Sequence, residues 1–193
     1  ILPGVGTPDL SLTPQEARAK LNLPASSDLK LVLFVGNDYA RKGLPALLAA
    51  MPALQPNIHV ACVGSPQMIP KFQLMAAELG ITERVHFVGA LTDMSIAYRA
   101  ADMLAHPTLE DAYGMVVLEA MAHGLPVVVS DAPYSGIAQD LLDGDNALLL
   151  KDPRDVAKIV ATLQRLLNDV DLVGRLSTRA LAFAQAHSWV RAA

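Results

Sequence analysis

Short apolar runs of strand length alternate with segments of helical period along most of this chain. The runs predict six strands, at residues 31–36, 58–64, 85–89, 103–106, 127–130 and 147–150. Strands that are apolar throughout are typical of a parallel sheet with both faces covered. Because strand–helix–strand crossovers are right-handed, the alternation predicts an α/β fold with a doubly wound, Rossmann-like parallel sheet.

Apolar residues recur at helical spacing between the predicted strands. The stripes are Leu44, Leu47, Leu48, Met51 and Leu54, then Phe72, Met75, Ala76 and Leu79, then Val156, Ile159, Val160, Leu163, Leu166 and Leu167. Pro153 suits the first turn of the third helix, and a last helix is expected over about residues 172–186.

Residues 1–29 depart from this alternation and are predicted to be a lead-in or hinge segment before a domain of residues 30–193. Thr13 and Glu16 have the spacing of a capping box, so one helix should begin after Thr13. The chain starts at Ile1, and residues 1–5 read as an element already under way. We therefore expect a piece of a longer protein.

Charge and composition exclude several functional classes. The formal net charge of -4 argues against a nucleic-acid partner held by general electrostatics. No apolar run reaches membrane-spanning length. The single Cys62 lies in an apolar run and reads as a buried small residue, which fits a reducing compartment. No metal is expected, because no His, Cys, Asp or Glu cluster has metal-ligand spacing.

The loop at residues 36–43 follows a predicted strand, where such sheets bind ligands. It runs from Gly36 to two adjacent cations, Arg41 and Lys42, just before a helix. Cations at a helix start oppose the helix dipole, so local stability does not explain them. A diphosphate would, because Arg offers a planar fork and Lys a point charge. The alternative is a solvated basic pair on a turn.

A second loop places Asp111 and Gly114 before a short helix that carries Glu119. Free amides at a helix start favour an anion, and carboxylates accept hydrogen bonds from sugar hydroxyls. The stretch therefore indicates a ligand that is both phosphate and sugar. An alternative role for Asp111 is to cap the helix. Glu119 has apolar neighbours and needs a partner, from the protein or from a ligand.

Histidines and known nucleotide motifs add little to this picture. His106 ends a predicted strand before the acidic loop; we favour a structural histidine over a ligand contact. His59, His86 and His187 are scattered along the chain. Residues 36–43 do not form a Walker A loop, and a GxGxxG fingerprint is absent, which counts against NAD chemistry.

Several motifs, in order, resemble the carboxyl-terminal half of a retaining GT-B glycosyltransferase of the family-4 type. Residues 36–43, GNDYARKG, are similar to that family's basic phosphate loop, and residues 85–89, VHFVG, to its V-x-F-x-G strand. Residues 103–107 and 111–126 are similar to its E-x7-E signature and the tail that follows it. The likeness runs from about Leu2 to His187 and, within the family, is greatest to lipopolysaccharide core α-glucosyltransferases. It implies one half of a GT-B fold.

The resemblance implies that these residues bind a UDP-sugar. Arg41 and Lys42 would hold the diphosphate and stabilise the leaving UDP. Glu119 would bind the ribose hydroxyls, and Asp111 those of the donor sugar. Other implied substrate contacts are Gly36, Gly64, Leu91, His106, Tyr113, Gly114, Met115 and Val116. Asp111 replaces the family's first glutamate, which shortens this side chain by one methylene.

The resemblance also implies the activity of the whole protein. It would move a hexose from a UDP-sugar to a glycan or lipid-linked acceptor, in lipopolysaccharide or cell-envelope glycan synthesis, without a metal or other cofactor. An amino-terminal domain missing from this chain would bind the acceptor, so the chain alone should bind UDP but transfer nothing. The expected location is the cytoplasm, or the inner face of the membrane for the full-length protein. Two alternatives remain, a UDP-sugar 2-epimerase and a non-catalytic nucleotide-binding module.

Overall fold

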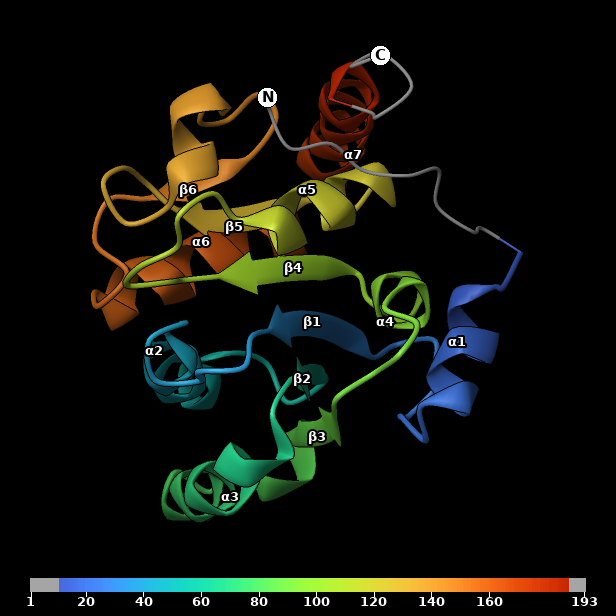
Figure 1. The fold of residues 1–193 in the computed structure, drawn as a ribbon. Helices are drawn as coiled ribbons and strands as arrows, with labels where there is room; N and C mark the ends of the chain where they lie inside the picture. Colours follow the sequence, from blue (N-terminus) through green and yellow to red (C-terminus); the bar gives the residue numbers. More distant parts are fainter. Residues whose placement is uncertain (1–10, 188–193) are drawn as a thin grey trace.

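A six-stranded parallel sheet forms the centre of the computed structural model, which describes residues 11–187 (Figure 1). The strands are β1 (Lys30–Val35), β2 (Ile58–Val63), β3 (Val85–Gly89), β4 (Met103–His106), β5 (Val127–Ser130) and β6 (Leu148–Leu150). Their order in the sheet is β3-β2-β1-β4-β5-β6, and all pairs are parallel. The predicted fold class is confirmed, and no predicted strand end differs from the observed one by more than one residue.

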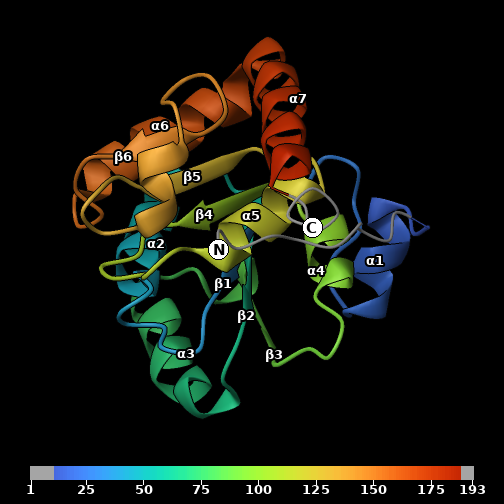
Figure 2. The ribbon, with the colours of Figure 1, turned by 45° about the horizontal axis from the view of Figure 1, so that its top comes forward.

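Helices cover both faces of this sheet (Figures 1 and 2). One face carries α1 (Pro14–Lys20), α4 (Ser95–Ala100) and α5 (Met115–Ala122), and the other carries α2 (Leu44–Ala50), α3 (Ile69–Glu78) and α6 (Val156–Asn168). The last helix, α7 (Val170–Ala186), packs on α6 near its start and on α5 near its end. Strand side chains alternate between the two covered faces, so Leu33 belongs to one apolar cluster and Phe34 to the other. This double burial explains why the strands are apolar throughout.

Two details of the helices differ from the sequence prediction. Pro153 lies before α6, because Asp155 is the N-cap and its side chain accepts a hydrogen bond from the Lys158 amide. Helix α4 is not predicted from the sequence at all. With six residues it is too short for its apolar positions to reveal a helical period.

The described part of the lead-in segment packs against the sheet domain. Helix α1 begins with the expected capping box between Thr13 and Glu16. Arg18 of this helix is buried and donates to Asp102 Oδ2 at 2.7 Å and to the Ala100 carbonyl at 2.8 Å. These contacts tie α1 to the turn between α4 and β4. Residues 1–5, which read as an element already under way, lie outside the described residues.

The chain changes direction across the sheet between β1 and β4. Strand β1 leads to α2 on one face, whereas β4 leads to α5 on the other. Because the two connecting loops diverge, a crevice is expected at the carboxyl ends of these strands. Within residues 11–187, no helix has the length and apolar character needed to cross a membrane.

Candidate functional site

A cavity of about 650 Å³ lies at the carboxyl edge of the sheet, between the loops that follow β1 and β4. Its lining residues are Val35, Gly36, Asn37, Lys42, Val63, Gly64, Ala90, Leu91, Met94, His106, Asp111, Ala112, Tyr113, Gly114, Met115 and Val116. All eight residues that the sequence analysis gives as substrate contacts are in this lining, together with Lys42 and Asp111. Arg41 and Glu119 are not.

Lys42, Asp111 and His106 meet inside the cavity. Lys42 Nζ lies 2.7 Å from Asp111 Oδ2 and 3.1 Å from the Glu110 carbonyl oxygen. His106 Nε2 lies 3.0 Å from the same Asp111 Oδ2. Asp111 Oδ2 is therefore contacted by two residues, the fully buried His106 at the end of β4 and Lys42 of the loop after β1.

The charges in this group follow from its surroundings. Burial by itself raises the pKa of Asp111, but hydrogen bonds from His106 and Lys42 outweigh it and hold that pKa well below its usual range. Burial lowers the pKa of His106, so this ring is neutral at pH 7. The neutral ring then donates its Nε2–H to Asp111, a tautomer assigned from the hydrogen-bond partners. Its buried Nδ1 has no hydrogen-bond partner among the described residues.

Gly43 allows the two loops to touch. Its φ is +85°, and a Cβ atom there would lie 1.8 Å from the Pro107 carbonyl oxygen. The loops are also joined by the Leu109 amide, which donates to the Arg41 carbonyl at 2.8 Å. Only glycine fits this approach, and the approach brings Lys42 within reach of Asp111.

Helix α5 presents its first amides to the cavity. Gly114 is its N-cap at φ +101°, and in the described part of the chain no side chain caps the helix. The alternative prediction that Asp111 caps this helix is therefore wrong, because the Asp111 side chain bonds Lys42 and His106 instead. Its own amide donates to the Tyr134 carbonyl at 2.8 Å, which ties it to the loop after β5. Uncapped amides and the helix dipole together favour an anion beside Met115 and Val116.

The structure separates the two adjacent cations. Lys42 has a side chain that is 18% exposed and lies in the cavity. The Arg41 side chain is 53% exposed and lies 3.6 Å from Asp38 of its own loop. Arg41 is thus a surface residue beside the cavity.

Glu119 lies one helical turn beyond the cavity lining, on α5. Its Oε2 accepts a hydrogen bond from the hydroxyl of Tyr98 at 2.6 Å. The inference that Glu119 needs a partner is confirmed, and the partner is a residue that the sequence analysis missed. A buried tyrosine usually bonds through its hydroxyl, but the sequence does not show that Tyr98 is buried.

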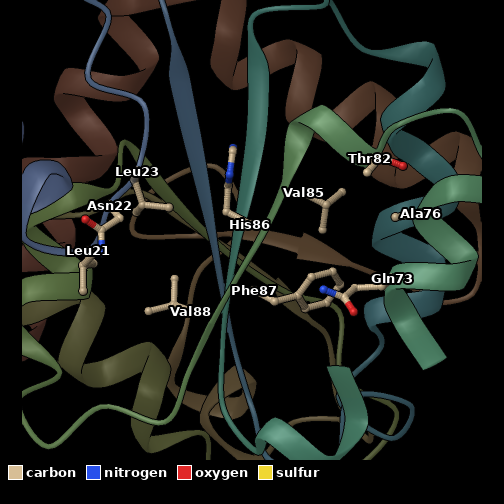
Figure 3. A pocket seen from close by; sticks show the side chains of 10 residues that line it. All are labelled: Leu21, Asn22, Leu23, Gln73, Ala76, Thr82, Val85, His86, Phe87 and Val88. Atoms are coloured by element: carbon tan, nitrogen blue, oxygen red, sulfur yellow. The ribbon is translucent and has the colours of Figure 1, made fainter. Parts of the chain in front are cut away.

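Two histidines that are far apart in the sequence meet on β2 and β3, at the side of the sheet where β3 is the outermost strand. His59 Nδ1 and His86 Nε2 are 2.9 Å apart, because β2 and β3 are neighbours. His86 borders a second cavity of about 450 Å³ beside β3 (Figure 3). Between residues 11 and 187, no group of three or more His, Cys, Asp or Glu side chains is arranged to hold a metal ion.

Residues 29–169 match the family described as Glycosyl transferases group 1. The chain belongs to this family. Over 198 residues it is 31% identical to the D-inositol 3-phosphate glycosyltransferase of Corynebacterium efficiens, covering 97% of the chain and 46% of that relative. Over 146 residues it is 33% identical to the lipopolysaccharide glucosyltransferase WaaG of Escherichia coli K12, covering 74% of the chain and 38% of WaaG. The group 1 chain thus spans less than half the length of these relatives.

Solved structures place this group 1 chain within a larger fold. The crystal structure of WaaG, a glycosyltransferase involved in lipopolysaccharide biosynthesis, matches at TM-score 0.82 and 27% identity, over 96% of the chain and 51% of that structure. The C-terminal domain of a group 1 glycosyltransferase, LpcC of Francisella tularensis, matches in fold at TM-score 0.79 and 19% identity, over 95% of the chain and 97% of that domain. The chain therefore has the fold of that C-terminal domain, one half of a GT-B fold. Anabaena HepE in complex with UDP and glucose has the same fold over 49% of its length, at TM-score 0.79 and 22% identity over 93% of the chain.

Proposed function

We propose that this chain is the donor-binding domain of a retaining glycosyltransferase and that it binds a UDP-sugar in the cavity between β1 and β4. The observation that carries the proposal is the joint position of Lys42 and the uncapped start of α5 in one cavity. A lysine and free helix amides suit a diphosphate, and the neighbouring carboxylates suit hydroxyls. The HepE structure, which contains UDP and glucose, supports a nucleotide-sugar on this fold.

Each part of the ligand has a proposed partner. Lys42 and the amides of Met115 and Val116 bind the phosphates and stabilise charge on the departing UDP. Within residues 11–187 the Arg41 side chain has one ion pair, the 3.6 Å contact to Asp38, so this exposed side chain can turn toward the diphosphate from outside the cavity.

The proposed sugar and base contacts lie in the same cavity or, for Glu119, one helical turn beyond its lining. Glu119 accepts hydrogen bonds from the ribose hydroxyls, and Asp111 from the donor sugar through acceptor capacity beyond Lys42 and His106. Gly36, His106, Tyr113 and Gly114 contact the sugar or the phosphates, and backbone groups near Gly64 and Leu91 contact uracil.

The proposal for the whole protein goes further. Residues 30–193 form the donor domain after a lead-in of residues 1–29, and an amino-terminal domain binds a glycan or lipid-linked acceptor. The enzyme transfers a hexose in lipopolysaccharide or cell-envelope glycan synthesis, in the cytoplasm or at the inner face of the membrane, and this chain alone transfers nothing. The likeness to WaaG supports a lipopolysaccharide acceptor, whereas the inositol phosphate relatives support a small polyol phosphate. The family match favours transfer over the epimerase and non-catalytic alternatives.

Titration calorimetry of this chain with UDP tests the donor site. We expect heat of binding with a dissociation constant of about 1 mM or tighter, equivalent to roughly 4 kcal/mol. Uridine, which lacks the diphosphate, should bind more weakly. Absence of heat at millimolar UDP, with the fold intact by circular dichroism, would falsify the proposed site.

A further inference from the structure

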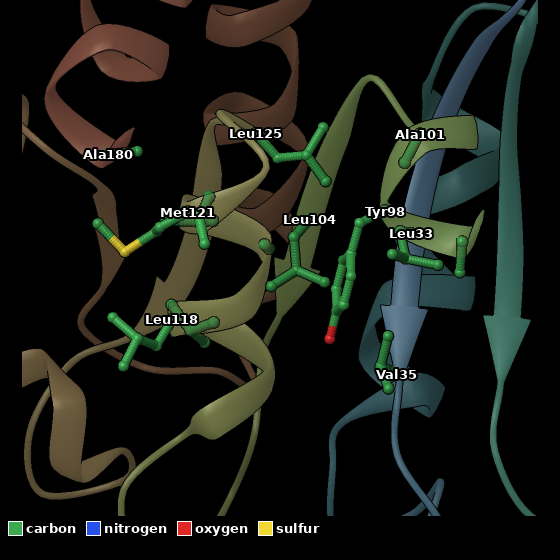
Figure 4. Close-up of a cluster of buried hydrophobic side chains, with 14 of the residues drawn as sticks. Leu33, Val35, Tyr98, Ala101, Leu104, Leu118, Met121, Leu125 and Ala180 are labelled. Atoms are coloured by element: carbon green, nitrogen blue, oxygen red, sulfur yellow. The ribbon is translucent and has the colours of Figure 1, made fainter. Parts of the chain in front are cut away.

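The hydroxyl of Tyr98 lies against Glu119, the carboxylate that we propose to bind the ribose. The two oxygens are 2.6 Å apart. Tyr98 is 2% exposed and packs in the apolar cluster under α5, beside Leu33 and Leu104 (Figure 4). In Figure 4 the Tyr98 hydroxyl points toward Val35, the last residue of β1, and thus toward the edge of the sheet where the cavity opens.

Tyr98 and Glu119 each lie four positions after a residue that lines the cavity. Met94 and Met115 line the cavity, and they precede Tyr98 and Glu119 by four residues. Residues four apart on a helix share a face. The hydrogen-bonded pair therefore joins α4 to α5 one helical turn beyond the lining residues.

Packing fixes Tyr98 more firmly than it fixes Glu119. The tyrosine ring lies among buried apolar side chains and 5.0 Å from the ring of His123, whose Nδ1–H donates to the Glu119 carbonyl at 2.9 Å. A glutamate side chain is long and flexible, and Glu119 is only half-buried. A donor at a fixed position holds Oε2 and leaves the rest of the carboxylate free to accept other hydrogen bonds. Burial and the charge of Glu119 raise the pKa of Tyr98 far above neutral pH, so its hydroxyl keeps the proton that it donates.

We propose that Tyr98 is a positioning residue that presents the Glu119 carboxylate to the ribose, and that this pair makes the site selective for ribose hydroxyls. The inference rests on the proposed function, because it requires a nucleotide in the cavity. It adds a residue that acts through Glu119 without touching the ligand.

The test compares UDP with 2′,3′-dideoxy-UDP, which lacks both ribose hydroxyls, by calorimetry on the same chain. Hydrogen bonds to a carboxylate should make the wild-type chain bind UDP roughly 10- to 100-fold more tightly than the dideoxy ligand. Tyr98→Phe should lower this ratio by about fivefold and leave affinity for the dideoxy ligand unchanged. Tyr134→Phe is the control, because its hydroxyl accepts a hydrogen bond from Arg154 at 3.3 Å and the residue is outside the cavity lining. It should leave the ratio unchanged.

The outcomes separate the two claims. No binding of UDP by the wild-type chain overturns the proposed function and this inference with it. UDP binding with an equal ratio in wild type and Tyr98→Phe overturns this inference alone, because a merely structural tyrosine lowers both affinities together. In a Glu119→Gln background, Tyr98→Phe should change the ratio less than twofold, and a larger change also counts against the inference. Should Tyr98→Phe not fold, Tyr98→Met fills the same apolar space without a hydroxyl and is read by the same ratio.

Discussion

Two aspartate–cation pairs lie at opposite ends of β4 and have the same N···O distance, 2.7 Å. At the amino end, Arg18 pairs with Asp102, which also accepts the Leu31 amide at 2.7 Å. Arg18 Nε and Nη1 also donate to the carbonyls of Ala100 and Leu29. At the carboxyl end, Lys42 pairs with Asp111 inside a cavity, next to His106, whose Nδ1 has no partner within residues 11–187.

The difference lies in what surrounds each pair rather than in the pair itself. The first pair bonds backbone groups of α4 and β1, and its arginine is buried, so its contacts are made within the fold. The second pair faces a cavity, so a ligand can bond the donor and acceptor positions of Lys42 and Asp111 that the pair leaves free. Because breaking a buried pair leaves a charge without compensation, the first pair should govern stability and the second should govern binding.

The largest expected effect comes from Arg18→Met, which removes the cation of the structural pair. Unfolding free energy, measured by urea denaturation, should fall by about 3 kcal/mol. This value is at the low end of the about 3 to 5 kcal/mol typical of a broken buried ion pair, because Lys30 Nζ remains 3.7 Å from Asp102 Oδ1. Affinity for UDP should not change while the chain is folded. The exposed Arg175→Met is the control and should shift stability by less than about 0.5 kcal/mol. A reduced UDP affinity in folded Arg18→Met would contradict the claim that this pair governs stability and not binding.

Lys42→Ala should show the opposite pattern. Affinity for UDP should fall by roughly 10- to 100-fold, because a charge-assisted hydrogen bond to phosphate is lost, while stability changes less than in Arg18→Met. Arg41→Ala is the matched neighbour; its loss should be only about threefold, because the side chain is exposed and outside the cavity lining. Calorimetry with UDP measures both. If Arg41→Ala weakens binding more than Lys42→Ala, the assignment of the main phosphate contact to Lys42 is wrong.

Asp111→Asn should have a smaller effect than Arg18→Met or Lys42→Ala, and a defined pH dependence. The folded pKa of Asp111 lies below its unfolded value, so its stabilisation is present above about pH 5 and is lost as pH falls through the folded pKa. The difference in unfolding free energy between wild type and Asp111→Asn should be about 1 kcal/mol near pH 6 and should shrink toward pH 3. Denaturation curves at several pH values test this. A difference that stays constant down to pH 3 contradicts the ionised pair.

Much of the site is predictable because its residues belong to loops at the ends of recognisable strands. Gly36, Lys42, Asp111 and Gly114 all follow β1 or β4, and parallel strands bring their carboxyl ends to one edge. The missed features depend on burial. Tyr98 lies on a helix too short to show a period, and His59 meets His86 only because β2 and β3 are adjacent.

The parallel sheet, most of its helices and the two loops that meet can be predicted from the sequence, because strand and helix periods are local properties of the chain. The sequence does not show that Lys42 rather than Arg41 enters the cavity, that Asp111 bonds His106, or that Tyr98 bonds Glu119. These contacts depend on which side chains are brought together when the helices and strands pack. Lys42 and Asp111 are separated by 69 positions, and Tyr98 and Glu119 by 21.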